Sequence, residues 1–466
     1  MASVKYEISK RFTMESPITS RTLAISEAFG ISLDDEQTFT VYDNEEITIT
    51  TGDIVYITGD SGSGKSILLR ELKQRIPNGI SNSELTINSD QPIIEAVGKD
   101  LEEAMYLLSL VGLNDAFIFL RKYSELSDGQ KYRFQLAKLL ESNANCYFID
   151  EYCALLDRET AKVVSFNIQK ICRKLGKTLI VATAHTDLAD DLLPNLLIRK
   201  GLENDVQVEY RKVRENPQCS LVEKLELLPA TLEDYYVLSR FHYRQRKVQA
   251  VQEIYKLVNG KEIVGVIVYV YPPLALAGRN VVTSRYKAAT SEVARLINQE
   301  VTMISRVVLH PKYRGIGLGT KLIKDTMPLT SKRYVEALTV MGRYNPFNEK
   351  AGLRKVEYET KDRYKKVRNQ LILLGWDMKM ASTRQYNLDK LNDLDEATYK
   401  LLADQIVTKV LQGRTYCVRG GGRKGKVKDG SDFMKEEVAS MIKEIVPKEK
   451  VYLIWENPDW NMEAVG

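Results

Sequence analysis

Eight consecutive residues in the first part of the chain have the types and spacing of a phosphate-binding loop. Residues 59–66 read GDSGSGKS and fit the pattern G-x-x-x-x-G-K-[ST]. In such a loop the glycines let backbone N–H groups curl around phosphate oxygens, the lysine reaches the β- and γ-phosphates, and the last hydroxyl binds Mg²⁺. The residues expected to hold ATP are Gly59, Ser61, Gly62, Ser63, Gly64, Lys65 and Ser66.

Elements on both sides must position this loop. Asp53 to Thr58 have the pattern of a short buried strand, and a helix is expected from Ile67 with its positive end toward the phosphates. A glycine-rich turn without a ligand is the structural alternative. Because strand, loop, Lys-Ser pair and helix occur together, we favour a nucleotide site.

Two neighbouring acids follow another apolar segment, Cys146 to Ile149. Magnesium bound to ATP needs a carboxylate in addition to the hydroxyl, and Asp150 is the candidate. Glu151 is then placed to polarise a water molecule. A buried strand that simply ends in acids is the alternative when this segment is considered alone.

The pentapeptide LSDGQ, Leu126 to Gln130, comes before that strand and opens a helix. Here the chain resembles the ABC ATPases, whose pattern L-S-G-G-Q differs only at Asp128. The resemblance covers roughly residues 20–210. It implies a homodimer that sandwiches two nucleotides, because in this family the signature contacts ATP on the opposite subunit. The residues implied to make these contacts are Ser127, Gly129, Gln130 and Asp157.

The same resemblance assigns three further roles. His185, after the apolar segment Thr178 to Ala182, matches the switch histidine of the family. Gln91 stands where a glutamine of the family binds magnesium, so the implied metal ligands are Ser66, Gln91 and Asp150. Tyr42 could stack on adenine or could be a core tyrosine of a sheet.

A second strand–loop–helix pattern lies near residue 310. The apolar segment Met303 to His310 runs into PKYRGIGLGT, residues 311–320, and a helix is expected from Lys321. Glycines at alternate positions leave room for backbone N–H groups to approach a pyrophosphate at a helix amino terminus. The spacing G-x-G-x-G differs from the dinucleotide-binding turn G-x-G-x-x-G.

This segment resembles the pyrophosphate loop of the GNAT acetyltransferases, with the pattern [QR]-x-x-G-x-[GA]. The resemblance covers roughly residues 220–360 and implies an acyl-coenzyme A site. The family often uses a carboxylate base and a tyrosine acid, for which Glu300, Glu292 and Tyr344 are candidates, with Tyr344 taken as catalytic. The implied acyl-CoA contacts are Val307, Val308, Leu309, Arg314, Gly315, Ile316, Gly317, Leu318, Gly319, Thr320 and Asn345.

These motifs predict a chain of the α/β class with at least two domains, since 466 residues are too many for one core. Residues 1–212 are expected to form a P-loop ABC-type nucleotide-binding domain and residues 213–362 an α+β GNAT-like acyltransferase domain. Residues 363–466 are expected to be a helical and basic C-terminal extension.

The composition limits the other possibilities. Five cysteines without a C-x-x-C pair indicate reduced thiols and no structural metal. The amino terminus has no apolar run of a secretory signal, and the most apolar stretch, Ile263 to Tyr271, is shorter than the ~20 residues that span a bilayer. We therefore expect a cytoplasmic protein without a membrane-spanning segment.

Two basic clusters suggest a nucleic-acid partner, DNA or RNA. Arg240 to Lys247 interleaves aromatic and cationic residues, and Arg414 to Lys428 combines cations with glycines. Solvated basic surfaces are the alternative for both, because the net charge of +5 is mild.

The leading hypothesis is an ATP-hydrolysing ATPase coupled to an acyl-CoA-dependent transferase that modifies a nucleic-acid base. Its cofactors would be ATP, Mg²⁺ and acetyl-CoA or another acyl-CoA. One alternative is a nucleic-acid- or ribosome-associated ATPase whose second domain only senses acyl-CoA. The other is an N-acetyltransferase of a protein or a small molecule.

Overall fold

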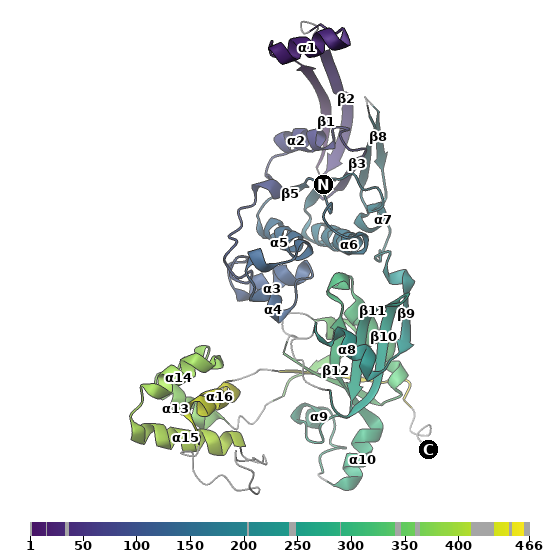
Figure 1. Ribbon diagram of the computed structural model, residues 1–466. Coiled ribbons are helices and arrows are strands. Elements are labelled where there is room, and N and C mark those ends of the chain that lie inside the picture. Colours follow the sequence, from purple (N-terminus) through teal and green to yellow (C-terminus); the bar gives the residue numbers. More distant parts are fainter. Residues whose placement is uncertain are drawn as a thin grey trace.

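The protein is described by a computed structural model (Figure 1). The described residues are 2–14, 16–32, 37–202, 205–241, 248–288, 290–340, 346–358, 364–411, 433–446 and 450–460.

The amino-terminal domain is built on a six-stranded sheet of order β4-β5-β6-β3-β7-β8. Every neighbouring pair is parallel except β7 and β8, which are antiparallel. The central strands are continuously apolar and buried on both faces, as parallel strands covered by helices must be. The strands are β3 (Ile54–Gly59), β4 (Gly79–Ser81), β5 (Cys146–Ile149), β6 (Thr178–Ala182), β7 (Leu196–Lys200) and β8 (Val206–Tyr210).

Two apolar cores cover the two faces of this sheet. Alternate residues of β3 divide between them, with Ile54 and Tyr56 in one and Val55 and Ile57 in the other. The helices of this domain are α2 (Lys65–Arg75), α3 (Leu101–Leu110), α4 (Ala116–Phe119), α5 (Asp128–Glu141), α6 (Arg158–Leu175) and α7 (Ala189–Leu192).

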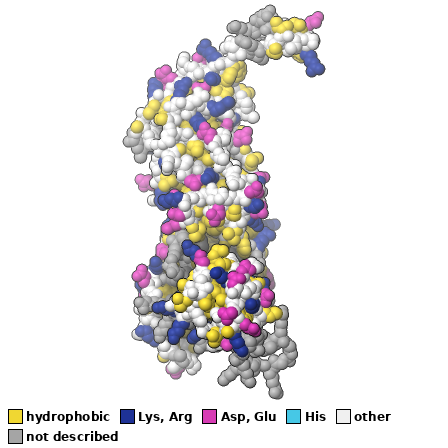
Figure 2. All heavy atoms as spheres, turned by 90° about the vertical axis from the view of Figure 1, so that its left-hand side faces the viewer, with side chains coloured by type: hydrophobic (Ala, Val, Ile, Leu, Met, Phe, Trp, Pro, Cys, Tyr) yellow, Lys and Arg dark blue, Asp and Glu magenta, His cyan; other side chains and the backbone are white. Residues whose placement is uncertain are grey.

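A two-stranded antiparallel arm extends from the amino-terminal domain (Figure 1). It consists of β1 (Ser3–Met14) and β2 (Gln37–Thr50), with helix α1 (Ser20–Phe29) at its tip. No residue of α1 is buried, and Leu23, Ile25 and Phe29 are exposed. Apolar side chains are accordingly visible at the far end of the arm in Figure 2.

The second domain is built on a seven-stranded sheet of order β14-β15-β13-β12-β11-β10-β9. Only β12 and β13 run parallel; the other neighbours are antiparallel. The strands are β9 (Leu225–Pro229), β10 (Val251–Asn259), β11 (Glu262–Val270), β12 (Val301–Leu309), β13 (Tyr334–Thr339), β14 (Arg354–Val356) and β15 (Val451–Glu456).

The parallel pair separates along its length. Pairing of β12 with β13 ends at Ile304 and Ala337, although β12 continues to Leu309. At the same point the register of β12 against β11 shifts by a bulge that leaves Ser305 unpaired. Bulges of this kind bend a strand, which is consistent with the separation of the two strands.

The position of strand β15 shows that the expected division of the chain into domains was wrong at its carboxyl end. Residues 363–466 were expected to lie outside the second domain, but β15 pairs with β13 on one side and with β14 on the other. The helices before it are therefore an insertion between two strands of one sheet. They have their own apolar core and are α13 (Lys365–Leu373), α14 (Arg384–Asn392), α15 (Glu396–Leu411) and α16 (Lys435–Ile445).

Helices also cover the second sheet on both faces, since Ile267 and Tyr269 of β11 join one core and Val266 and Val268 another. These helices are α8 (Leu232–Ser239), α9 (Ala277–Val282), α10 (Ser291–Glu300), α11 (Leu318–Thr326) and α12 (Phe347–Lys350). In the described part of the chain, none of the helices is both long and apolar enough to cross a membrane.

Candidate functional site

The P-loop lies between β3 and α2 and needs glycine at two of its positions. At Gly59 a Cβ would stand 2.0 Å from the Lys200 carbonyl oxygen, and at Gly64 it would stand 2.5 Å from Val41 Cγ1. Both residues have a positive φ, 137° and 102°, which side chains disfavour. The loop conformation therefore excludes larger residues at both ends of the glycine pattern.

The Lys65 ammonium is held over this loop. Its Nζ donates to the carbonyl oxygens of Gly59, at 2.9 Å, and of Asp60. Burial lowers the pKa of Lys65, while the charges of Asp60 and Asp150 act in the opposite direction. A half-buried cation over a glycine-rich loop at a helix amino terminus is an anion-binding arrangement.

The predicted metal ligands Ser66 and Asp150 are brought together. Ser66 Oγ donates to Asp150 Oδ1 at 2.9 Å, and the N–H of Glu151 donates to the same oxygen at 2.9 Å. They meet because the carboxyl ends of β3 and β5 lie at one edge of the parallel sheet. A hydroxyl and one carboxylate are the protein groups that Mg²⁺ takes when phosphate oxygens complete its shell.

Gln91, the third predicted metal ligand, makes no hydrogen bond to this pair among the described residues. Its Nε2 donates to the Glu95 carbonyl oxygen at 2.9 Å. Tyr42 is fully buried in the core beneath the loop, where its hydroxyl donates to the Gly64 carbonyl oxygen at 3.1 Å. Of the two interpretations of Tyr42, the core tyrosine is the one that the structure has.

The signature segment opens helix α5. Ser127 is the N-cap, and its N–H donates to Gln130 Oε1 at 3.1 Å. Ser127 and Asp128 are exposed, and Gly129 lies in the first turn of the helix. The helix thus begins three residues before the expected start at Lys131, because the N-cap is part of the signature itself.

His185 follows β6 at the same edge of the sheet. Its carbonyl oxygen accepts hydrogen bonds from the hydroxyls of Tyr56 and of Thr58, the latter at 2.6 Å. Burial and then the nearby Arg158 lower the pKa of the His185 imidazole. Arg158 also pairs with Asp187, so the segment after the histidine is tied to the start of α6.

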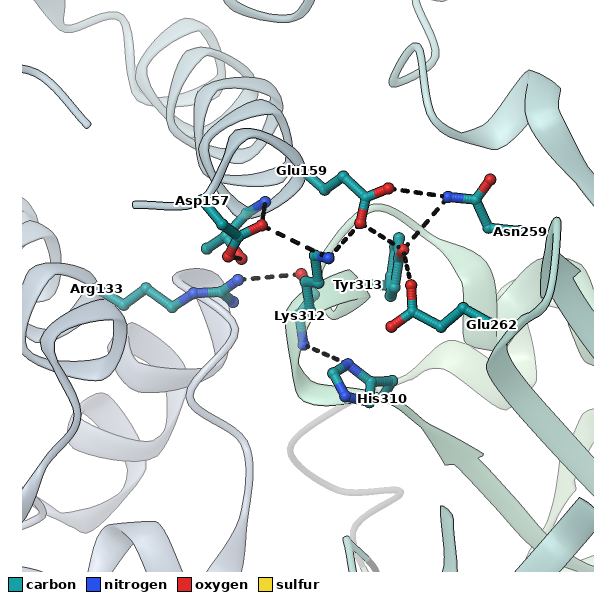
Figure 3. Close-up of polar contacts among 9 residues, drawn as sticks. Arg133, Asp157, Glu159, Asn259, Glu262, His310, Lys312 and Tyr313 are labelled. Carbon is teal, nitrogen blue, oxygen red and sulfur yellow. Dashed lines mark hydrogen bonds and ion pairs between the residues drawn. The ribbon is translucent and has the colours of Figure 1, made fainter. Parts of the chain in front are cut away.

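Asp157, expected to reach a second subunit, here caps α6 and faces the second domain. Its Oδ1 accepts from the Thr160 N–H at 3.0 Å and lies 3.5 Å from Lys312 Nζ (Figure 3). Lys312 also pairs with Glu159. Tyr313, fully buried, donates from its hydroxyl toward Glu159 and Glu262, at 2.8 and 2.7 Å.

The interface includes the signature helix as well. Arg133 of α5 donates to the Lys312 carbonyl oxygen at 3.2 Å (Figure 3) and to the Val111 carbonyl oxygen at 3.4 Å. Val163 and Phe166 of α6 belong to the apolar core of the second domain. The segment from His310 to Gly315 is therefore held by several elements of the nucleotide-binding domain. Glu159, Arg133 and Asn167 belong to no motif, so this role could not be predicted from local sequence.

The glycine loop after β12 is open on one side. Gly315 and Gly317 are exposed and have φ values of 97° and 88°. Within the described residues, no hydrogen bond is made by the backbone N–H groups of Gly315, Ile316 and Gly317. Helix α11 begins at Leu318 rather than at Lys321, since Gly319 and Thr320 are accommodated in its first turn. The amino terminus of α11 therefore presents several backbone N–H groups that have no hydrogen-bond partner among the described residues.

The side chain of Arg314 lies inside the domain interface. It is 7% exposed, donates to the carbonyl oxygens of Leu309 and Phe241, and approaches Asp115 at 3.7 Å. Of the expected acyl-CoA contact at Arg314, only the backbone can therefore take part. Of the strand residues, Val308 is buried, whereas Val307 and Leu309 are half-buried.

Of the acid–base candidates of the second domain, the two carboxylates can be compared with their surroundings. Glu300 is 4% exposed and is bound by Arg285 at 2.6 Å and by the Tyr286 hydroxyl, so it is a structural ion pair. Glu292 lies exposed in the first turn of α10. Tyr344 and Asn345 lie outside the described residues, as do most of the first basic cluster and the whole of the second.

Comparison with known proteins bears on the amino-terminal domain. No protein-family model matches the chain. The methionine import ATP-binding protein MetN of Corynebacterium glutamicum is 27% identical over 227 residues, which cover 40% of this chain and 61% of that protein. The alpha-hemolysin translocation ATP-binding protein HlyB of Escherichia coli is 28% identical over 198 residues, 34% of this chain and 28% of that protein.

Among solved structures, a dimeric ATP-binding cassette in a post-hydrolysis state with ADP and Pi is 17% identical. The match has a TM-score of 0.33 and covers 46% of this chain and 100% of that chain. The P-loop geometry and the curated relatives, similar over about 40% of the chain, define an α/β nucleotide-binding domain of the ABC type.

Proposed function

We propose that the protein hydrolyses ATP in its amino-terminal domain and transfers an acyl group from acyl-CoA in its second domain. The observation that carries this proposal is that each domain has a strand, a glycine loop and a helix amino terminus, β3 to α2 and β12 to α11. Such loops bind phosphates through backbone N–H groups. The loop after β3 suits ATP, because Lys65 and the predicted magnesium ligands Ser66 and Asp150 lie beside it.

In the ATPase domain, Lys65 would bind the β- and γ-phosphates, and Ser66 and Asp150 would hold magnesium, which neutralises phosphate charge when bound. Glu151 is exposed beside Asp150 and would orient the attacking water. His185, whose pKa is lowered by burial, would be a neutral hydrogen-bonding partner of the γ-phosphate. ATP binding agrees with the names of the curated relatives.

The ATPase would work as a homodimer. Ser127 is exposed at the amino terminus of α5, where its hydroxyl and the helix dipole can meet a phosphate of a second chain. Gly129 and Gln130 would complete that contact, whereas Asp157 faces the second domain of its own chain. Closure on ATP and opening after hydrolysis would then follow from binding two nucleotides between two chains.

The second domain is proposed to be GNAT-like. Support comes from its sheet, in which a single parallel pair, β12 and β13, separates at a bulge and is flanked by antiparallel strands. Beyond Ile304 the edge of β12 that faces β13 pairs with none of the described residues, so Val307 to Leu309 could bind an extended acyl-pantetheine chain. The N–H groups of Gly315 to Thr320 would bind the pyrophosphate.

For the acceptor we propose a nucleic acid, DNA or RNA. Its support is the sequence of the two basic clusters, which combine cations with aromatic residues or glycines. Both alternatives would share the two ligand sites. A nucleic-acid- or ribosome-associated ATPase that only senses acyl-CoA would transfer no acyl group, and an N-acetyltransferase of a protein or a small molecule would differ in the acceptor.

Hydrolysis of ATP by the purified protein, measured with and without single- and double-stranded DNA and RNA, tests the proposal. Glu151→Gln is the hydrolysis-deficient control. Stimulation by one polymer, followed by acyl transfer to it from acetyl-CoA, is the expected result. No hydrolysis above that of Glu151→Gln would contradict the ATPase, and hydrolysis that no polymer changes would contradict the nucleic-acid acceptor.

A further inference from the structure

The glycine loop of the second domain is contacted by a residue of the ATPase domain. Asn167, 6% exposed on helix α6, donates from Nδ2 to the Arg314 carbonyl oxygen at 3.3 Å. The fit is close, since a Cβ at Gly315 would stand 2.3 Å from the same Nδ2. The peptide between Arg314 and Gly315 is therefore held on one side by Asn167.

The geometry of the peptide bond makes this contact directional. In a trans peptide the C=O and the N–H point in opposite directions. The chain has no cis peptide among its described residues. Because the Arg314 C=O points at Asn167, the Gly315 N–H points away from the ATPase domain, toward the exposed side of the loop.

Asn167 is itself firmly placed. On the same helix, Val163 and Phe166 pack in the apolar core of the second domain. At the start of the helix, Asp157 and Glu159 pair with Lys312, three residues before the glycine (Figure 3). The first part of α6, as far as Asn167, thus lies along the segment that leads into the loop.

We propose that Asn167 of the ATPase domain is a positioning residue for the acyl-CoA pyrophosphate, acting by orienting the Arg314–Gly315 peptide. The inference rests on the proposed acyl-CoA site. A residue of the ATPase domain thus completes the acyl-CoA site of the second domain. Movement of α6 in the ATPase domain would therefore change acyl-CoA affinity.

A cation on the same helix agrees with this. Lys170 lies one turn after Asn167, and its pKa is lowered by burial, then by the nearby cations Lys350 and Lys174. Lys350 ends α12, whose Phe347 ring lies beside Gly319 of the loop. Lys170 and Lys350, one from each domain, thus repel each other, and each lies on a helix that contacts the loop, α6 through Asn167 and α12 through Phe347.

The test uses the full chain and the uncharged variant Asn167→Leu, which is similar in size and lacks the donor. The control is Asn259→Leu, since Asn259 lies at the same interface but donates to Glu159 Oε1, at 3.1 Å, and to the Tyr313 hydroxyl, at 3.4 Å, and not to the backbone of the glycine loop. Binding of coenzyme A is measured by calorimetry. Binding of pantetheine, which has no pyrophosphate, is measured by its displacement of bound coenzyme A. ATP affinity and the melting temperature are followed in parallel.

We expect Asn167→Leu to weaken coenzyme A binding about five- to tenfold, the loss of one oriented hydrogen bond, and to leave pantetheine and ATP binding unchanged. Asn259→Leu should bind coenzyme A as the wild type does. Equal coenzyme A affinity in Asn167→Leu and wild type, or an equal loss for pantetheine, would overturn the inference and leave the acyl-CoA site standing. A wild-type protein that binds no coenzyme A would overturn the proposed function itself.

Discussion

At the scale of residues, the charge state of His185 depends on Arg158. Burial and the Arg158 charge both lower the pKa of this imidazole, so it stays neutral to a lower pH than an ordinary histidine. In Arg158→Gln we expect the pKa of His185 to rise, because one of the two causes is removed. If neutral His185 is needed, the acid limb of the ATPase pH profile should move to higher pH.

The imidazole pKa can be measured by NMR, since the chain has only three histidines. Lys162→Gln, a change of another cation on α6, is the matched control and should leave the value unchanged. A His185 pKa that is the same in Arg158→Gln and wild type would show that burial alone accounts for the lowering.

The phosphate-loop residues could be predicted from the sequence because their role is local. Gly59, Gly64, Lys65 and Ser66 are adjacent, and a loop that exposes N–H groups restricts residue types directly. Tyr42 and Glu300 could not be assigned, because their burial depends on packing with residues distant in sequence, such as Lys200 and Arg285.

At the scale of elements, a buried ion pair fixes helix α9 to strand β13. Arg279 and Glu336 are 1% and 0% exposed, with two hydrogen bonds of 2.6 and 2.7 Å between them, and Tyr452 donates to Glu336 at 2.7 Å. Glu336→Gln would leave a buried arginine without its counter-charge. We expect a loss of ~3–5 kcal/mol in the free energy of unfolding, measured by urea denaturation.

The exposed Glu226 of β9 provides the control for this change. Glu226→Gln should alter the free energy of unfolding by less than ~0.5 kcal/mol. A similar small effect of Glu336→Gln would mean that the pair is not needed to hold α9.

Elements with local signals were predicted well, and those that depend on distant partners were not. The strand before the P-loop has a nearly continuous apolar run, the strand before the second glycine loop is mostly apolar, and both agree with the sequence prediction. Strand β15 was missed, because its neighbours β13 and β14 precede a long helical insertion and nothing local reveals the pairing.

At the scale of the whole molecule, the insertion and the last strand should behave differently on deletion. Helices α13 to α16 have a core of their own, whereas β15 lies between two strands of the second sheet. Replacing residues 359–449 by a short Gly/Ser linker should keep a folded protein that binds ATP and coenzyme A. Ending the chain at residue 358 removes β15 and should unfold the second domain.

Thermal melts and ligand titrations of both forms check this expectation. The full chain is the reference for both deletions. Equal stability of the two shortened chains would contradict the role of β15 in the sheet.

The proposed function requires two phosphate-binding loops in one chain, one for ATP and one for acyl-CoA. Hydrogen–deuterium exchange of the full chain tests it directly, because the binding groups are backbone N–H groups. ATP with magnesium should protect residues 59–66, and coenzyme A should protect residues 315–320. If coenzyme A left the exchange of residues 315–320 unchanged, this result would contradict the proposed acyl-CoA site.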